Sequence, residues 1–342
     1  MSSAALGRRL LDQLRRELGE PAVGYAEPPA PISGGYDTRI FAFRLRSAPS
    51  TFSGPLILRL LGPQHDPTRV LREEAVQNAV ARLGYPAPRV LSASADPTVL
   101  GGAFLVMERL PGRPILEVRW VGVASVLAEM QLRLHALDAG PLLEAMDRAG
   151  GRDAVTFDGL LAQLRDRIGR RPLEGLRGAT DWLTGQCPPP PEHPVICHGD
   201  IHPQNILMAD GAVTGVIDWP NAVVADPAYD VAATRIILGL VPLKLSAMPA
   251  PMRGLIRLVR PMLLARHLAR YRRRRPIDPR VLAYYEAASC MRLLVRVAES
   301  RLSAAAEGVA LNPLDASSFG ERLCGRFARI TGIAPSLPAV TA

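Results

Sequence analysis

The sequence predicts an α+β chain of two lobes, a small N-terminal lobe built on an antiparallel β-sheet and a larger, mainly helical C-terminal lobe. Its 342 residues are too many for one minimal domain and too few for three. Short strand-like runs with helices fill residues 1–108, whereas helical patterns dominate residues 109–342. The hydrophobic fraction of 48% is typical of a globular protein.

The N-terminal lobe is predicted to open with an amphipathic helix over residues 3–18. Leucines recur there at helical spacing, at Leu6, Leu10, Leu11, Leu14 and Leu18. A proline-rich link over residues 28–31 is expected to follow. Residues 40–45 and 56–60 have strand character, and the Ser/Pro/Gly stretch between them predicts a hairpin with a loose loop.

A second helix is predicted over residues 69–83, with Glu73 on the same face as the apolar Val76 and Val80. Residues 90–93 and 104–108 are the next strand candidates. The Pro111-Gly112 turn that follows indicates the junction between the lobes, so we expect the boundary after residue 108.

The C-terminal lobe begins with a predicted buried helix over residues 123–137. Its β content is expected in three short runs, residues 195–197, 206–208 and 213–217. Polar turns separate these runs. Because loops held by rigid elements often carry function, we expect the chemistry there.

The charge pattern limits the choice of functional residues. The formal net charge is +9, which alone would suggest nucleic acid or an anionic membrane as a partner. However, Lys244 is the only lysine, and such arginine usage can reflect genome composition. No nucleic-acid partner is expected, and a nucleotide site in the first hundred residues must use arginine in place of lysine.

Other sequence features indicate a cytoplasmic protein. The four cysteines are scattered and form no metal-knuckle or redox pair, as is typical of a reduced compartment. Arginines interrupt the apolar residues of the N-terminus, so no secretory signal is predicted. The apolar run over residues 231–243 is too short to span a bilayer.

The strongest functional signal is His198-Gly199-Asp200-Ile201-His202-Pro203-Gln204-Asn205, followed after one hairpin by Ile217-Asp218-Trp219. Phosphoryl transfer requires a carboxylate that orients the attacking hydroxyl, and oxygen ligands that hold Mg²⁺ against the phosphates. Asp200 suits the first role, and Asn205 and Asp218 suit the second. Each residue alone could belong to an ordinary turn, but their combination is specific.

These motifs resemble those of the aminoglycoside phosphotransferase and choline kinase family, small-molecule relatives of the protein kinases. HGDxHPxN followed by IDW is similar to that family's catalytic and metal-binding loops. The resemblance implies a bilobal protein-kinase-like fold, Mg²⁺, and ATP or GTP as the donor to a small-molecule hydroxyl. It also implies that Asp230 braces the catalytic loop.

The resemblance places the nucleotide in the N-terminal lobe. Ser33, Gly34 and Gly35 look like the family's phosphate-covering turn, where glycine lets backbone N–H groups approach phosphate. Arg59 stands where kinases have a phosphate-binding lysine. Glu73 is its expected partner, with Glu74 as the alternative, although a surface ion pair would look the same in sequence.

The adenine is expected at the end of the strand over residues 104–108. Met107, Glu108 and Leu110 resemble the segment whose backbone reads the adenine edge. No Walker loop competes for the nucleotide, because GxxxxGK[ST] is absent.

The sequence departs from the family pattern at three positions without loss of a catalytic group. Pro220, Ala225 and Thr38 replace an acidic residue, a glycine and an asparagine that are common there. The positive charge and the lack of an acidic cluster in the helical half argue against polycationic aminoglycosides as substrates. An alcohol-bearing metabolite or a less charged natural product is the expected acceptor.

Two other functions remain open from the sequence. A pseudokinase could use the fold to bind a nucleotide or a partner without turnover. A basic peripheral membrane or nucleic-acid-binding protein could use the arginine-rich stretch from Arg253 to Arg275, although such a stretch is more often a solvated helix face.

Overall fold

The computed structural model describes residues 2–32, 38–62, 65–119, 121–148, 151–241, 250–308, 311, 314–315 and 318–339. Contacts group the chain into two compact units. The first contains residues 1–118, 140–151 and 204–220, and the second contains residues 119–139, 152–203 and 221–342. The lobe boundary expected after residue 108 stays a prediction. In the grouping by contacts, the short hairpin that carries Asn205 and Asp218 belongs to the first unit.

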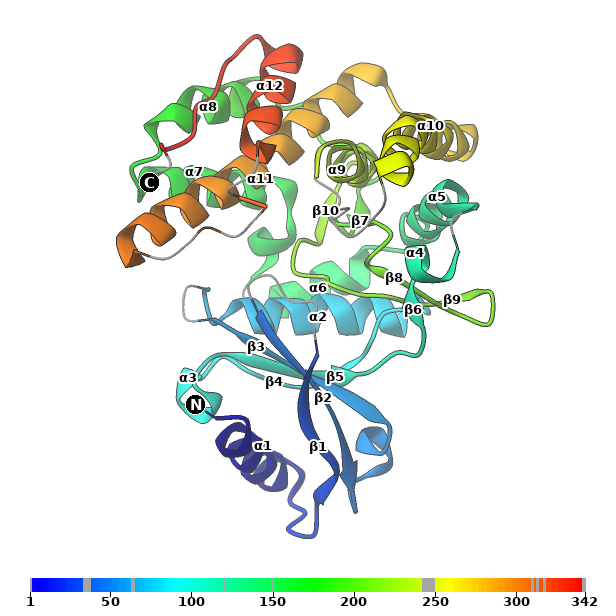
Figure 1. The fold of residues 1–342 in the computed structure, drawn as a ribbon, viewed down its shortest axis with the longest axis vertical. Coiled ribbons are helices and arrows are strands. Elements are labelled where there is room, and N and C mark those ends of the chain that lie inside the picture. The colour runs from blue at the N-terminus through cyan, green and yellow to red at the C-terminus, as the bar shows by residue number, and fades with distance from the viewer. Residues whose placement is uncertain are drawn as a thin grey trace. The chain divides into compact units, whose positions relative to one another are not determined.

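The first unit is organised around a five-stranded antiparallel sheet of order β1-β2-β3-β5-β4 (Figure 1). Its strands are β1 (Gly24–Ile32), β2 (Thr38–Arg46), β3 (Pro55–Leu61), β4 (Val90–Ser94) and β5 (Phe104–Glu108). Helix α1 (Ser3–Leu18) places Leu6, Leu10 and Leu14 in a core with apolar side chains of the sheet. Short α3 (Pro97–Leu100) lies beside α1, and the 3₁₀ turn η1 (Ser50–Phe52) joins β2 to β3.

Helix α2 (Arg69–Arg82) packs against β4 and α6 (Gly140–Arg148) in the same unit. A second, three-stranded sheet consists of β6 (Arg113–Pro114), β8 (Ile206–Ala209) and β9 (Ala212–Val216). Short α4 (Ile115–Val118) lies next to β6 and β8. The main-chain N–H of Val216 donates to Pro86 O at 2.7 Å and so links this sheet to the segment after α2.

The second unit is mainly helical. Its helices are α5 (Val123–Leu134), α7 (Phe157–Gly169), α8 (Arg177–Gly185), α9 (Pro227–Leu240), α10 (Ala250–Arg274), α11 (Pro279–Glu307) and α12 (Phe319–Thr331). Two 3₁₀ turns, η2 (Arg152–Val155) and η3 (Glu174–Leu176), precede α7 and α8. Strands β7 (Val195–Cys197) and β10 (Val223–Ala225) form a two-stranded ladder. Fully buried residues of α9 and α11, among them Tyr229 and Leu294, form the core.

The predicted elements agree with this fold apart from the proline-rich link and the end of one helix. The prolines of residues 28–31 were expected in a link, but they belong to strand β1. The reason is that β1 is an edge strand that pairs only with β2, so a proline lacking an N–H is tolerated on its outer side. Strand β10 was not predicted, and helix α5 ends at Leu134, three residues before the predicted end.

Candidate active site

The loop that carries Asp200 follows strand β7 in the second unit. Gly199 has a φ of 74°, and a Cβ at this position would lie 2.5 Å from the main-chain oxygen of Asn221, so only glycine fits. Asn221 Nδ2 lies 3.5 Å from Asp200 Oδ2, and His202 Nε2 lies 3.8 Å from Asp200 Oδ1. The Asp200 carboxylate is therefore flanked by two polar side chains of the same unit.

Asp230 supports this loop from helix α9. Asp226 is the N-cap of the helix and Pro227 its first residue, and the Asp226 side chain accepts from Ala228 N at 2.7 Å. The fully buried Asp230 then accepts the Gly199 N–H at 2.7 Å on Oδ1. The bracing contact implied by the resemblance is thus present.

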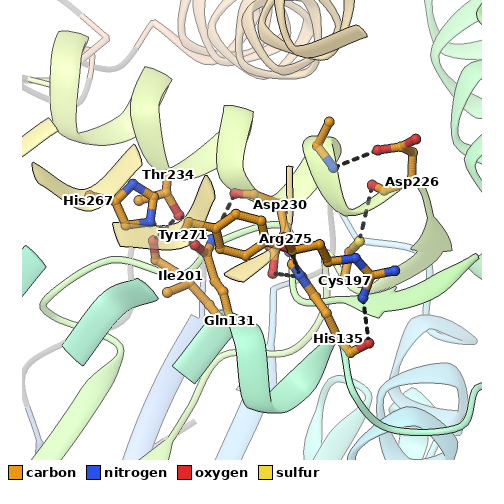
Figure 2. Close-up of polar contacts among 12 residues, drawn as sticks. Gln131, His135, Cys197, Ile201, Asp226, Asp230, Thr234, His267, Tyr271 and Arg275 are labelled. Atoms are coloured by element: carbon orange, nitrogen blue, oxygen red, sulfur yellow. Dashed lines mark hydrogen bonds and ion pairs between the residues drawn. The ribbon is translucent and has the colours of Figure 1, made fainter. Parts of the chain in front are cut away.

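A buried polar network surrounds Asp230 (Figure 2). His135 Nε2 lies 3.1 Å from Asp230 Oδ2, and because a carboxylate only accepts, Nε2 carries the hydrogen. In the neutral ring Nδ1 then accepts from the Tyr271 hydroxyl at 2.6 Å. Burial alone would raise the pKa of Asp230, but the hydrogen bonds from His135 and from the Gly199 N–H hold that pKa below its ordinary value.

A second branch of the network ends on the loop that carries Asp200. His267 Nε2 donates to Gln131 Oε1 at 2.7 Å, and Gln131 Nε2 donates to Thr234 Oγ1 at 3.0 Å. Thr234 Oγ1 in turn donates to Ile201 O at 2.7 Å (Figure 2). Helices α5, α9 and α10 are therefore joined by a chain of hydrogen bonds to Ile201, the residue that follows Asp200.

Asn205 and Asp218 lie together in the first unit. The Ile217 N–H donates to Asn205 O at 2.9 Å, so the residue before Asp218 is tied to Asn205. Asn205 is 7% exposed. Asp218 has a half-exposed side chain and a φ of 71°, a left-handed conformation that is uncommon outside glycine and often occurs at functional sites.

Arg59 bridges Asp218 and Glu73 in the same unit. Its guanidinium forms a short contact with Glu73 Oε1, and Nη2 lies 3.3 Å from Asp218 Oδ1. The predicted pairing of Arg59 with Glu73, not Glu74, is therefore present. Burial raises the pKa of Glu73, whereas Arg59 acts in the opposite direction. Within the described part of the chain, Glu73 Oε2 is buried without a hydrogen-bond partner.

Two further arginines of helix α2 surround this group. Arg72 donates to Pro220 O at 3.1 Å, two residues after Asp218. Arg69 is close enough to Glu73, Arg59 and Asp218 to respond to their charges, and its burial lowers its pKa. The side chain of Arg69 forms no hydrogen bond or ion pair with any residue that the structure describes.

The structure describes only some of the remaining residues that were predicted to bind the nucleotide. Ser33, Gly34 and Gly35 lie outside the described residues. Met107 and Glu108 end strand β5, where the Glu108 N–H donates to Arg89 O at 3.0 Å and the Glu108 side chain binds Arg89. Leu110 lies against Gly215. Their roles, and those of the other predicted site residues, stay predictions.

The arginine-rich stretch forms helix α10, and two of its arginines have structural contacts. Arg260 Nη2 donates to Val241 O at 2.6 Å, and Arg275, just after the helix, donates to His135 O at 2.9 Å. Contact of this stretch with a membrane stays an untested alternative. No helix among the described residues is long and apolar enough to cross a bilayer.

Comparison with known proteins identifies the family. The model of the phosphotransferase enzyme family matches residues 29–254, about two thirds of the chain. The chain belongs to this family. The predicted relationship to the aminoglycoside phosphotransferases, and with it a kinase-like enzyme, is thereby confirmed.

Curated relatives of this phosphotransferase share part of its length. An aminoglycoside 3'-phosphotransferase of Streptomyces fradiae is 33% identical over 169 residues, which cover 44% of this chain and 58% of that protein. Acyl-CoA dehydrogenase family member 11 of Gallus gallus is 28% identical over 177 residues, 48% of this chain and 22% of that protein. The chain thus matches about a fifth of one relative and less than two thirds of the other.

Solved structures confirm the predicted α+β protein-kinase-like fold. A thermostable mutant of aminoglycoside phosphotransferase APH(4)-Ia, in a ternary complex with ADP and hygromycin B, superposes with a TM-score of 0.59 at 18% identity, over 96% of this chain and 99% of that one. An aminoglycoside-3'-phosphotransferase of type VIII gives 0.52 at 22% identity, over 82% and 97%. At these identities the likeness concerns the fold alone.

Several residues of the site were not predicted from the sequence. Asn221, His135, Arg69 and Arg292 all contact or surround predicted site residues. The buried His135 could have been suspected together with Gln131, because these two polar residues stand four positions apart in a helix predicted to be buried. Its partners Asp230 and Tyr271 are 95 and 136 positions away, so no local pattern could name them.

Proposed function

We propose that this phosphotransferase transfers the γ-phosphoryl group of ATP or GTP to a hydroxyl group of a small molecule. The observation that carries the proposal is the bridge made by Arg59 between Glu73 and Asp218. A kinase-type site needs a cation for the phosphates, a buried carboxylate that holds this cation, and a second carboxylate for the metal. These three groups are adjacent in the first unit.

Asn205 and Asp218 fit a magnesium site. Mg²⁺ prefers oxygen ligands and usually binds through one or two protein groups together with waters and substrate phosphates. One amide and one partly exposed carboxylate on tied loops provide this donor set. The described residues contain no group of three or more His, Cys, Asp or Glu side chains that would form a closed metal cage. When bound, the ion would neutralise charge on the phosphates.

The donor phosphates are assigned to arginines. Glu73 holds Arg59. Arg69 adds a second guanidinium, which forms no hydrogen bond or ion pair with a described residue. Three arginines, including Arg72, face two carboxylates, so this group keeps a net positive charge that suits phosphate. Ser33, Gly34 and Gly35 are proposed to cover the phosphates, as the resemblance to the family implies.

The adenine is assigned to the backbone at Met107, Glu108 and Leu110. The Glu108 and Arg109 N–H groups are already bonded to Arg89 O and Pro55 O. The nucleotide base would therefore have to use the neighbouring Glu108 carbonyl and Leu110 N–H groups. Substitution of the Met107, Glu108 or Leu110 side chain should therefore change nucleotide binding little.

Asp200 is proposed to orient the attacking hydroxyl and to accept its proton. Asn221 and His202 flank its carboxylate, which restricts the directions available to the oxygens. A reacting group that is already held in the correct orientation lowers the activation barrier, because the entropy of orienting it has been lost before the reaction begins. The proton moves from the acceptor hydroxyl to Asp200 as the oxygen attacks the phosphorus.

The acceptor is proposed to be an uncharged or weakly charged alcohol and not a polycation. Three carboxylates of the helical unit are already paired with arginines. Glu286 pairs with Arg235 at 2.6 Å, Asp315 with Arg296 at 3.0 Å, and Glu299 with Arg167 at 3.0 Å. A site for an aminoglycoside would need carboxylates that are free to pair with its ammonium groups.

The proposal is tested by incubating purified protein with Mg-ATP or Mg-GTP and a panel of alcohols, amino alcohols, sugars and macrolides. Mass spectrometry should find one product heavier by a phosphate, formed only when nucleotide and magnesium are present. Stabilisation of the protein by nucleotide without any product would instead support a pseudokinase. Steeply salt-dependent binding to anionic vesicles or nucleic acid would support the basic-surface alternative.

A further inference from the structure

Arg292 contacts the loop that carries Asp200 from helix α11. Its charge is opposite to that of Asp230, which contacts the same loop. Its Nη2 donates to Gly199 O at 2.7 Å, whereas Asp230 Oδ1 accepts the Gly199 N–H at the same distance. Both main-chain polar groups of Gly199 are therefore bonded to charged side chains, one from α9 and one from α11. Hydrogen bonds to charged groups are about twice as strong as neutral ones.

The Gly199 carbonyl belongs to the peptide group that ends at the nitrogen of Asp200. Rotation of this peptide would move the Asp200 side chain directly. Glycine populates many backbone conformations, and Gly199 lies in the left-handed region, so its own preferences do not prevent such a rotation. The loop therefore needs contacts from outside that hold the peptide in one orientation.

Arg292 is placed to hold the peptide group between Gly199 and Asp200. Its neighbours Met291 and Leu294 on α11 are fully buried, which fixes the helix, and its Nε is buried without a partner among the described residues. Burial raises the pKa of the nearby Tyr229 to about 12, with Arg292 acting against this rise and Asp200 adding to it. Arg292 and Asp200 thus lie around the same buried ring.

We propose that Arg292 is a positioning residue for the phosphotransferase reaction. It acts through the Gly199 carbonyl and holds the peptide before Asp200, so that the carboxylate is already oriented when the hydroxyl arrives. This inference rests on the proposed role of Asp200. It predicts an effect on the chemical step and not on nucleotide binding.

The test compares Arg292→Gln and Arg292→Lys with Arg296→Gln in the full-length protein. Arg296 is a matched control because it lies one turn further along α11 and donates to Asp315 at 3.0 Å, away from the loop. Two quantities are measured with Mg-ATP as the probe. One is phosphate release when water is the acceptor, or ADP formation when an alcohol acceptor has been identified, and the other is hydrogen–deuterium exchange of peptides covering residues 195–203.

We expect Arg292→Gln to lower kcat by about 10- to 100-fold with the KM for ATP within about twofold, as for a small misplacement of a reacting group. Exchange in residues 195–203 should rise, while Arg292→Lys should recover part of both. Arg296→Gln should change neither. Equal behaviour of Arg292→Gln and Arg296→Gln, or an effect confined to the KM of the acceptor, would overturn the inference.

The exchange measurement separates this inference from the proposed function. If Asp200→Asn leaves phosphate release unchanged, the proposed role of Asp200 fails whatever Arg292 does. If Asp200→Asn abolishes release but loop exchange is unchanged in Arg292→Gln, only the role of Arg292 fails.

Discussion

Arg59 Nη2 lies 3.3 Å from Asp218 Oδ1, while the same guanidinium holds the buried Glu73. One side chain therefore links the carboxylate proposed for magnesium to the helix α2 that supports the proposed phosphate site. A change at Arg59 should affect both stability and nucleotide binding.

Arg59→Gln is expected to destabilise the protein by about 3–5 kcal/mol, because it leaves the Glu73 carboxylate, which is 1% exposed, without its cation. The free energy of unfolding is measured in urea. Arg89→Gln is the control, since its ion pair with Glu108 is exposed and should contribute less than about 1 kcal/mol. A similar loss in both variants would refute the role assigned to the Arg59–Glu73 pair.

Arg69→Gln should weaken binding of Mg-ATP by about tenfold or more, because a charge-assisted hydrogen bond to phosphate contributes about 1.5–3 kcal/mol. Titration calorimetry measures the Kd. Arg82→Gln removes the same charge from an exposed position on the same helix and should leave the Kd unchanged. If the two variants bind equally well, Arg69 does not contact the phosphates.

Local patterns predicted much of the fold. Helix α1 and strand β5 occur with the predicted bounds, because leucine spacing and a short apolar run before Pro111 are strong signals. Strand β1 was missed because its prolines mask an edge strand. Strand β10 has three residues and forms only through pairing with β7.

The site was predictable only where a motif named its residues. The pair Arg59 and Glu73 followed from the kinase pattern, and their contact is present. Arg292 carries no such signal, because its contact with Gly199 spans 93 positions and depends on how α11 packs. Contacts of this kind are set by tertiary packing, which periodicity does not encode.

Gly199→Ala should reduce phosphate release more than 100-fold, because a Cβ there would meet Asn221 O at 2.5 Å and displace Asp200. Gly211→Ala is the matched control. Gly211 also has a positive φ, of 79°, but no atom lies within 4 Å of its would-be Cβ. The Gly211→Ala protein should lose about 1–2 kcal/mol of stability through backbone strain and keep its activity. Comparable activity in both variants would contradict the fit described for Gly199.

Acid should destabilise the protein in part through His267. Burial, with the charge of Arg235, lowers the pKa of this histidine from 6.5 to about 4. The unfolded chain therefore binds the proton more readily, so this contribution to stability is complete above about pH 6.5 and is lost as the pH falls to about 4. The loss amounts to about 3 kcal/mol.

His267→Gln, whose amide can still donate to Gln131, should flatten the pH dependence of the unfolding free energy between pH 4 and 6.5. His193→Gln is the control, because His193 is almost fully exposed and should leave the profile unchanged. An unaltered slope in His267→Gln would show that His267 is not the group responsible.

The most direct test of the account is transfer of labelled phosphate from Mg-ATP by the wild-type protein and by Asp200→Asn at equal nucleotide occupancy. The asparagine keeps the size of the side chain but cannot accept the hydroxyl proton. We predict a phosphorylated product with the wild-type protein, and at least about a 100-fold slower reaction with Asp200→Asn at an unchanged Kd for ATP. Equal rates for the two proteins would contradict the proposed function.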